Sequence, residues 1–278
     1  MILYHAPGGG FGHLSRALLF FSTFSIPDSE RYLITGDLPT SYSPGFHDLI
    51  SEKESPEEIS EKINKIIREM EITEIYIDTF PLGIIGELSF LKTKIPVHLI
   101  GRNLKIQVYL SDLEKRFGKL PDFPQFQSIY QMEEFSSEYY AFLNSYFSCP
   151  LHPFPYSPNI QKIDEVYSSG TPYYLVIHSG SSEELDYLVK YADQTMKVDK
   201  FDGKLIVIGR ENLESQKTTL KKYPAVEYFP EAKKIFTACG FNLLRELVAF
   251  RNKHICIPFP RRYDDQFFRK EIHFPNNA

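Results

Sequence analysis

The chain has 278 residues, of which 42% are hydrophobic and 24% charged, and its formal net charge is −5. These values are typical of a globular protein with room for one large domain or two smaller ones. A negative net charge argues against nonspecific binding to nucleic acid, which needs a basic face. We therefore expect no nucleic acid among the partners.

The cysteines and the N-terminus indicate the cellular location. Three cysteines are an odd number without metal-ligand spacing, so we expect buried thiols in a reducing compartment; they are Cys149, Cys239 and Cys256. No basic region followed by an apolar run opens the chain, and no apolar run approaches the ~18 residues that span a bilayer. The sequence predicts a cytoplasmic protein with no metal site and no resident cofactor.

The first segment predicts an anion-binding turn. Ile2–His5 is expected to form a strand, and Leu14–Phe21 a helix that packs back on the sheet. The residues between them include four glycines, Gly8, Gly9, Gly10 and Gly12. A strand, a glycine turn and a helix start bring free backbone N–H groups to one point. His13 and Arg16 lie on the first turn of that helix, so we expect them to face the ligand.

Strands and helices alternate through the first half, which predicts a parallel sheet covered on both faces. Strands are expected at 31–35, 74–78 and 97–100, a loop at 36–47, and helices from Pro56 and over 82–91. Ser55 and Glu58 form a capping box around Pro56. Ligands bind beyond the carboxyl ends of such strands, where Asp78 and Arg102 lie.

An aromatic segment and a proline cluster separate the two halves. Phe135, Tyr139, Phe142 and Tyr146 keep helical spacing, which favours a helix packed at an interface, and prolines between 150 and 158 indicate a linker. We expect the join between Cys149 and Gly170, with domains at 1–155 and 156–278.

The second half repeats the alternation. Strands are expected at 173–178, 205–208, 226–229, 235–238 and 254–257, and helices at 183–196, 211–222 and 240–251. Three residues at strand-end turns are expected to contact a ligand, namely Gly180, Ser181 and Arg210. The fold class is therefore α/β, with two Rossmann-like parallel-sheet domains facing a cleft.

Two polar segments follow the later strands. Asn242 and Glu246 lie four residues apart, hence on one helix face beyond Gly240, where a carboxylate can accept both hydroxyls of a ribose. Arg261 and Arg262 can bind phosphate oxygens, and Asp265 and Gln266 can bind sugar hydroxyls. Taken singly, Glu246 also fits a solvated helix carboxylate, and Arg261 with Asp264 a surface ion pair.

The chain resembles the two-domain GT-B glycosyltransferases in three segments and in the order of those segments along the sequence. They are Gly8–His13, Gly240–Glu246 and Pro258–Gln266. The resemblance is to the lipid-linked N-acetylglucosaminyltransferases of peptidoglycan synthesis and related nucleotide-sugar transferases. It implies that the glycine loop and His13 serve acceptor and donor phosphates. It further implies that Glu246 binds the nucleotide ribose, and that Asp265 and Gln266 contact the donor sugar.

A second resemblance leaves the acceptor open. Gly-Phe-Gly-His-x-x-Arg, ending at Arg16, is similar to a segment of the UDP-sugar hydrolase of pseudaminic acid synthesis, which uses water as acceptor. The chain is also short for the transferases, with about a dozen residues after Gln266.

We expect metal-independent transfer from a nucleotide diphosphate sugar, with a UDP-linked donor favoured. His13 is expected to act as general base with Asp78 orienting its ring, since an imidazole with a pKa near 6.5 suits that task. The acceptor stays open, an acceptor at a membrane surface included. A nucleotide-sugar hydrolase and a non-catalytic nucleotide-sugar-binding protein are the alternatives.

Overall fold

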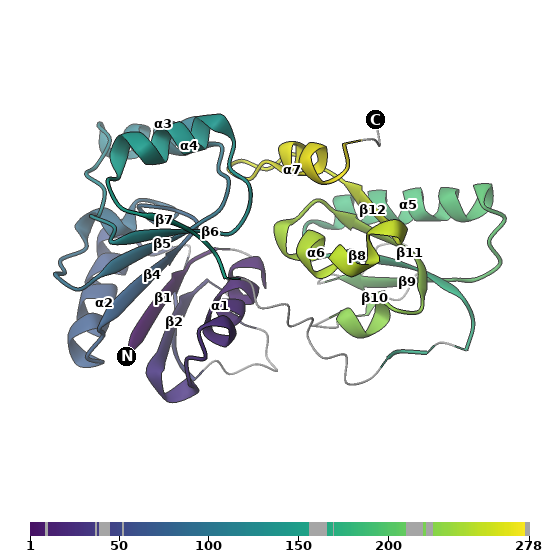
Figure 1. Cartoon of the computed structure of the whole chain (residues 1–278), viewed down its shortest axis with the longest axis horizontal. Helices are drawn as coiled ribbons and strands as arrows, with labels where there is room; N and C mark the ends of the chain where they lie inside the picture. The colour runs from purple at the N-terminus through teal and green to yellow at the C-terminus, as the bar shows by residue number, and fades with distance from the viewer. Residues whose placement is uncertain are drawn as a thin grey trace. The chain divides into compact units, whose positions relative to one another are not determined.

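The computed structural model describes residues 1–8, 11–36, 38, 45–51, 53–155, 166–168, 170–209, 219–220 and 225–275. They form two compact units (Figure 1). The first comprises Met1–Ser157 and the short segment Arg262–Asp265, and the second comprises Pro158–Arg261 and Gln266–Ala278. The predicted domain boundary borders residues 156–165, which lie outside the described part of the chain.

The first unit is built on a seven-stranded sheet in the order β3-β2-β1-β4-β5-β6-β7, with every described pair parallel. The strands are β1 Ile2–Ala6, β2 Arg31–Thr35, β3 Phe46–Leu49, β4 Glu74–Asp78, β5 Val97–Gly101, β6 Ser128–Gln131 and β7 Leu151–Pro153. The order reverses between β1 and β4. This switch point is where a doubly wound sheet opens a crevice for ligands.

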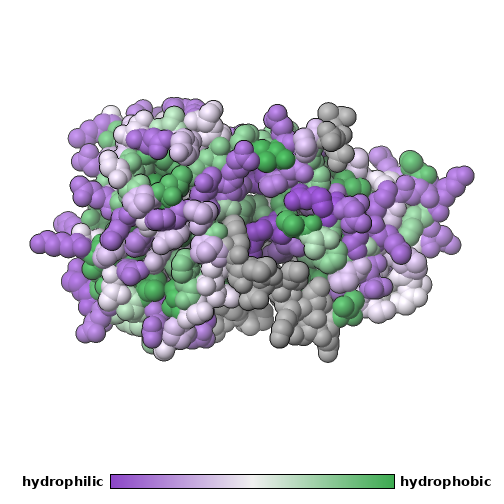
Figure 2. Space-filling view, in the orientation of Figure 1, coloured by the Kyte–Doolittle hydropathy of each residue, from purple (hydrophilic) through white to green (hydrophobic). Residues whose placement is uncertain are grey.

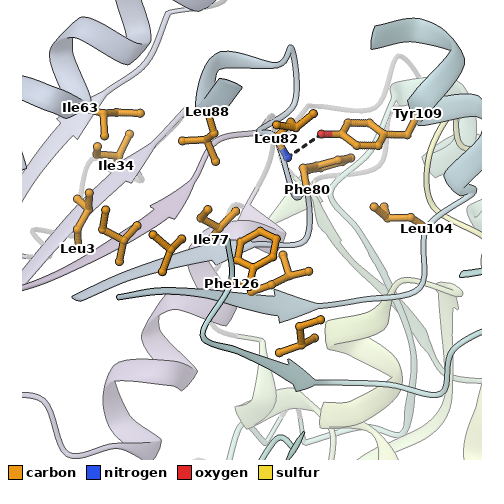
Figure 3. Close-up of a cluster of buried hydrophobic side chains, with 14 of the residues drawn as sticks. Leu3, Ile34, Ile63, Ile77, Phe80, Leu82, Leu88, Leu104, Tyr109 and Phe126 are labelled. Carbon is orange, nitrogen blue, oxygen red and sulfur yellow. Dashed lines mark hydrogen bonds between the residues drawn. The ribbon is translucent and has the colours of Figure 1, made fainter. Parts of the chain in front are cut away.

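Helices cover both faces of this sheet. They are α1 Phe11–Thr23, α2 Pro56–Glu69, α3 Ile106–Phe117 and α4 Ser137–Tyr146, with short 3₁₀ segments at Asp28–Glu30 and Glu87–Phe90. On one face Leu3 shares a buried cluster with Ile63 of α2 and Tyr109 of α3 (Figure 3). On the other, Tyr4 packs against Phe20 of α1 with ring centroids 5.1 Å apart. Alternate residues of β1 therefore serve opposite faces.

The second unit has its own five-stranded parallel sheet in the order β10-β9-β8-β11-β12. Its elements are β8 Tyr173–His178, α5 Ser182–Val198, β9 Lys204–Gly209, β10 Thr219–Leu220, 3₁₀ Val226–Tyr228, β11 Ala232–Ala238, α6 Phe241–Glu246, 3₁₀ Val248–Lys253, β12 His254–Ile257 and α7 Gln266–His273. All six residues of β8 are buried, as expected of a strand covered on both faces. Two separate parallel sheets confirm the predicted pair of Rossmann-like units.

Several predicted elements are wrong, and local backbone chemistry explains the clearest case. Residues 82–91 were expected to form a helix, but only Glu87–Phe90 is helical, as a 3₁₀ turn. Gly83 and Gly86 adopt left-handed φ values of 79° and 88°, which a continuous helix does not accommodate. Val226–Tyr228 is a 3₁₀ turn instead of a strand, and the helix from Gly240 ends at Glu246.

Other differences concern segments near the sheet edges. The expected helix over 211–222 contains the strand β10, and its other residues lie outside the described ones. Strand β3 begins inside the expected loop, at Phe46. Helix α3 and strands β6 and β7 were not predicted. By contrast, α2 begins at Pro56 as predicted, and its N-cap Ser55 makes the predicted reciprocal hydrogen bonds with Glu58.

The expectation of three unpaired buried thiols is also wrong. Cys239 and Cys256 form a disulfide with their Cα atoms 5.3 Å apart, and Cys149 is the remaining thiol. The parallel register explains the approach, because Thr237 of β11 is paired with Cys256 of β12. Cys239 follows β11 by one residue and therefore reaches its neighbour.

The surface carries both kinds of residue. Figure 2 shows hydrophilic and hydrophobic residues interspersed over the face in view. In the described ranges, no helix is long and apolar enough to cross a bilayer.

Candidate functional site

A buried polar cluster lies at the switch point of the first unit. Asp78, the last residue of β4, is fully buried, and Arg16 on α1 is 2% exposed. Arg16 donates from Nε to Asp78 Oδ1 at 2.8 Å and from Nη2 to Oδ2 at 2.6 Å. His13 Nδ1 lies 2.5 Å from the same Oδ2, and the Tyr4 hydroxyl donates to Oδ1 at 3.3 Å. One carboxylate thus organises an imidazole, a guanidinium and a phenol.

The cluster assigns a protonation pattern to His13. Two contacts meet at His13 Nδ1, namely Asp78 Oδ2 at 2.5 Å and Arg16 Nη2, itself a donor, at 2.9 Å. Because an ionised Asp78 can only accept and makes the shorter contact, we assign the proton to Nδ1 and the lone pair to Nε2. Burial, and next the Arg16 guanidinium, lower the pKa of His13, although the Asp78 carboxylate opposes them. Burial raises the pKa of Asp78, but Arg16 and His13 outweigh it and hold that pKa well below its usual range. The imidazole is therefore neutral at pH 7, and no hydrogen bond joins its Nε2 to another described residue.

The walls around His13 come from the glycine loop and the turn after β4. Gly8 lies against the imidazole so closely that a Cβ there would be 2.5 Å from His13 Cδ2 and Nε2. On another side, the Phe80 ring stacks on the imidazole with centroids 6.1 Å apart. These contacts restrict the ring to one orientation.

The turn that carries Phe80 is held from within the core. The Tyr109 hydroxyl accepts from Leu82 N at 3.0 Å and donates to Gly83 O at 2.7 Å, and Figure 3 shows Phe80, Leu82 and Tyr109 side by side. Glu87 is 1% exposed and accepts from the backbone N–H groups of the two residues that follow Gly83, at 3.2 and 3.0 Å. Burial raises the pKa of Glu87 to about 7.

Arg102 lies at the end of β5 in the same unit and is 8% exposed. Its Nη2 donates to Asp264 Oδ1 at 2.8 Å, and its Nε is 3.4 Å from Glu133 Oε1. Arg262 is ion-paired with Asp112 of α3 through Nε at 2.8 Å. The segment Arg262–Asp265 is thus fixed on the first unit by paired charges, and Asp265 within it is partly buried.

In the second unit, the side chain of Arg261, which follows β12, contacts the first turn of α5 next to the turn between β8 and α5. Ser181 caps α5 by accepting from Glu184 N, and Gly180 leaves room for the side chains of His178 and Glu184. The two terminal nitrogens of Arg261 donate to the two carboxylate oxygens of Glu184. His178 Nε2 is 2.8 Å from the same carboxylate. Arg261 therefore lies beside Gly180 and Ser181.

Glu246 ends α6, the helix that follows β11. It is partly buried, and burial raises its pKa to about 7, with Arg245 opposing the shift. Within the described residues it accepts no hydrogen bond and forms no ion pair. Gly240 precedes the helix with open space where a Cβ would be, and Asn242 is partly buried. The carboxyl group of Glu246, at the C-terminal end of α6, is therefore available to bind a ligand.

Of the remaining predicted site residues, two are placed by the structure and three lie outside its described part. Gln266 is 4% exposed, and its side-chain oxygen accepts from Phe259 N at 3.0 Å, so it shapes the backbone after β12. Gly12 lies in the first turn of α1. Three predicted residues lie outside the described part of the chain, namely Gly9, Gly10 and Arg210.

Sequence analysis missed several partners of the predicted residues. Tyr4 and Phe80 contact the cluster around His13, and His178 and Glu184 hold Arg261. Tyr4 alternates with core residues of β1, which was a usable signal for its position on the α1 face. The described residues contain no group of three or more His, Cys, Asp and Glu side chains arranged to hold a metal ion.

Two doubly wound parallel sheets, each with polar residues at the carboxyl ends of its strands, define the architecture of the GT-B glycosyltransferases. Solved structures of that class share the fold. A UGT transferase from Siraitia grosvenorii in complex with UDP superimposes with a TM-score of 0.54 at 13% identity, over 99% of this chain and 83% of that one. The glycosyltransferase SnogD from Streptomyces nogalater gives 0.55 at 13%, over 99% and 84%.

MurG from Acinetobacter baumannii is similar as well, with a TM-score of 0.53 at 11% identity over 98% of this chain and 82% of that one. At such identities the likeness establishes the fold. No protein-family model matches the chain, and no curated protein matches its sequence.

Proposed function

We propose that the protein is a glycosyltransferase that uses a nucleotide diphosphate sugar as donor and needs no metal ion. The observation that carries the proposal is the buried contact of His13 with Asp78 at the switch point of the first sheet. This is where a doubly wound fold binds its substrates. A neutral imidazole with Nδ1 fixed by a carboxylate is also the arrangement that a general base requires.

In the proposed reaction, His13 Nε2 takes the proton of an acceptor hydroxyl. The acceptor oxygen then forms a bond to the anomeric carbon of the donor, while the bond from that carbon to the diphosphate oxygen breaks. Asp78 stabilises the imidazolium through Nδ1, as the carboxylate does in other base–carboxylate pairs. Arg16 keeps Asp78 ionised, so its role is to position and to hold the charge.

The second unit supplies the donor-binding groups in this proposal. Glu246 binds the ribose hydroxyls, supported by its lack of a partner among the described residues. The departing diphosphate gains negative charge, which Arg261 and the N–H groups of the turn at Ser181 stabilise. UDP is the nucleotide that the sequence resemblance favours, and similar folds have been solved in complex with UDP and with thymidine diphosphate, so both nucleotides are candidates.

A binding screen followed by product analysis tests the proposal. Nucleoside diphosphates and their sugars are added to the full chain, and the melting temperature is measured. A ligand at a hundred times its dissociation constant stabilises a protein by about 2.7 kcal/mol, which gives a shift of several degrees. We expect a shift with at least one nucleotide sugar, and Glu246→Gln should reduce it.

Turnover of the bound donor then separates the alternatives. Transfer to added acceptors supports the transferase, and release of sugar to water alone identifies a hydrolase. Binding without turnover under any acceptor identifies a binding protein. If no nucleotide or nucleotide sugar binds at millimolar concentration, the proposal is wrong.

A further inference from the structure

Two buried ionisable side chains of the first unit play no part in the reaction proposed above. They are His5, the fourth residue of β1, and Glu87, the first residue of the 3₁₀ segment after β4. His5 is fully buried, Glu87 is 1% exposed, and His5 Nε2 lies 3.4 Å from Glu87 Oε1. Neither ring nitrogen of His5 has a hydrogen-bond partner among the described residues, although buried polar groups almost always have one. The Glu87 carboxyl group is therefore the partner within reach of this imidazole.

The ring of His5 is neutral at ordinary pH. Burial lowers its pKa to about 3; the Asp78 carboxylate opposes that shift and the His13 ring adds to it. A neutral imidazole has one donor and one acceptor nitrogen, and the two exchange roles when the ring proton moves between Nδ1 and Nε2. Nε2 of His5 can therefore accept from a protonated carboxyl group or donate to an ionised one.

Glu87, by contrast, changes its protonation near neutral pH. Burial raises its pKa to about 7, while its backbone hydrogen bonds and Arg116 of α3 oppose the shift. Tyr109 of α3 also faces Glu87, and burial raises the pKa of that hydroxyl well above its ordinary value, so it stays protonated. Within the pair, Glu87 is thus the member that gains or loses a proton, and His5 can match either form.

An apolar residue would suit the position of His5 better if the position had only to be filled. Its register partners on β2 and β4 are Ile34 and Ile77, which both belong to the apolar cluster packed against α2 and α3. Burying a polar ring without a hydrogen bond costs free energy. The backbone of the turn also closes over Glu87, because a Cβ at Gly83 would overlap its carboxyl group. Two polar groups are therefore enclosed together in an apolar layer.

Each member of the pair belongs to a segment that forms one wall around His13. His5 is three residues before Gly8, which lies against the imidazole of His13. Glu87 accepts from two backbone N–H groups of the turn that carries Phe80, and Phe80 stacks on the same imidazole. The contact between His5 and Glu87 consequently joins the two backbone segments that confine the ring of His13.

We propose that His5 and Glu87 are positioning residues for His13, joined by one shared proton that holds the segment at Gly8 and the turn after β4 together. The inference rests on the proposed glycosyl transfer, because it concerns the orientation of the candidate base. In the acid form, the Glu87 O–H donates to His5 Nε2 and the ring proton is on Nδ1. When the carboxyl proton leaves to solvent, the ring proton is on Nε2 and donates to the carboxylate. The link persists in both forms, so kcat does not follow the titration of Glu87.

NMR of the full chain with 15N-labelled histidine tests the shared proton without any need for turnover. His5→Gln identifies the resonances of His5 by their loss. We expect Nε2 of His5 to give an acceptor-type signal at pH 5.5 and a donor-type signal at pH 8.5, on either side of the pKa of Glu87. In Glu87→Gln the amide N–H donates to His5 at every pH, so Nε2 should stay acceptor-type. A tautomer that does not change with pH, or that changes equally in Glu87→Gln, overturns the inference.

Turnover of the donor tests the positioning role. His5→Leu should lower kcat by about 10- to 100-fold, as expected for a displacement of up to about 1 Å, and leave the donor KM unchanged. His5→Gln, whose amide offers a donor and an acceptor, should recover kcat, and Glu87→Gln should retain it. His98→Leu is the matched control, because His98 is a buried imidazole of β5 whose Nδ1 lies 2.7 Å from Ser128 Oγ. It should lose stability and keep kcat.

The two residues should also act as a unit. Glu87→Leu with His5→Leu should lower kcat no further than Glu87→Leu alone, since either change breaks the same link. Circular dichroism melting checks that the variants fold, and the NMR experiment on the unaltered chain does not depend on them. Unchanged kcat in His5→Leu, equal losses in His5→Leu and His98→Leu, or losses that multiply in the double variant overturn the inference.

A protein without turnover would contradict the proposed function and leave the positioning of His13 to be decided by NMR. The ring resonances of His13 should then shift or broaden in His5→Leu and stay in place in His98→Leu. Resonances of His13 that are the same in both variants overturn the inference.

Discussion

Gly8→Ala should disable the site by displacing the imidazole ring of His13. A Cβ at residue 8 would lie 2.5 Å from His13 Cδ2 and Nε2, whereas ordinary contacts begin at 3.4 Å. The backbone of Gly8 has little room to withdraw, because its carbonyl oxygen lies against Gly36. The imidazole must therefore move by about 1 Å, and a displacement of that size costs on the order of 10²-fold in rate.

The assay is turnover of the nucleotide sugar, with donor affinity measured separately. We expect kcat to fall on the order of 10²-fold. Donor binding should stay close to that of the unaltered protein, because the proposed donor groups lie in the second unit. Urea unfolding should show a loss of about 1–3 kcal/mol, since Gly8 has a φ of +153° that alanine rarely adopts.

Gly118→Ala is the matched control. Gly118 also has a positive φ, 76°, but a Cβ there meets nothing within 4 Å. This variant should lose stability and keep its kcat. If Gly8→Ala retains full turnover, or if both variants lose turnover equally, the claim that Gly8 positions His13 is refuted.

Three further predictions concern ionisable groups. Glu246→Gln should raise the donor KM roughly ten- to over a hundredfold at pH 8 and much less at pH 6. The reason is that the pKa of Glu246 is about 7 and only its carboxylate makes the charge-assisted contact. An increase in KM that is the same at both pH values would contradict this role. Burial and Arg16 lower the pKa of His13 below 6.5, and the neutral imidazole is the proposed base. The value of kcat should therefore stay constant down to pH 6.5 and fall only below it. A decline in kcat that begins above pH 6.5 would exclude His13 as the base. The pKa of Glu87 rises from 4.5 to about 7 on folding, so its protonated form stabilises the protein below pH 4.5 and that stabilisation is lost as pH rises through 7. Denaturant unfolding should show the unaltered chain losing about 3 kcal/mol over that interval relative to Glu87→Gln, and parallel profiles would refute the assignment.

Local signals predicted the parts of the fold that local chemistry determines. The capping box at Ser55 fixed the start of α2, and the buried apolar runs at 31–35, 74–78, 173–178 and 254–257 matched strands residue for residue. Helix α3 begins at Ile106, and its N-cap residue Lys105 makes no side-chain capping hydrogen bond, so its start carries no such signal. The turn after β4 depends on the hydroxyl of Tyr109, a residue of α3 that meets this turn only in the folded core.

The candidate site was predictable where one strand end supplied it. Asp78 and His13 could be placed at the same sheet edge from the strand–turn–helix pattern, and the structure brings them into contact. The partners of Arg261 and Arg262 could not be predicted, because each pairing joins distant segments of the chain. Arg261 meets Glu184 and Arg262 meets Asp112, separations of 77 and 150 residues that no spacing rule reveals.

The most direct test of the account is release of nucleoside diphosphate from UDP-sugars by the unaltered protein and by His13→Ala, with EDTA present in both. The account predicts release that persists in EDTA and falls roughly 10²–10⁴-fold in the variant, with donor affinity unchanged. Release that is equal in the two proteins would contradict the role of His13. Complete loss in EDTA, restored by a divalent ion, would contradict the metal-independent reaction.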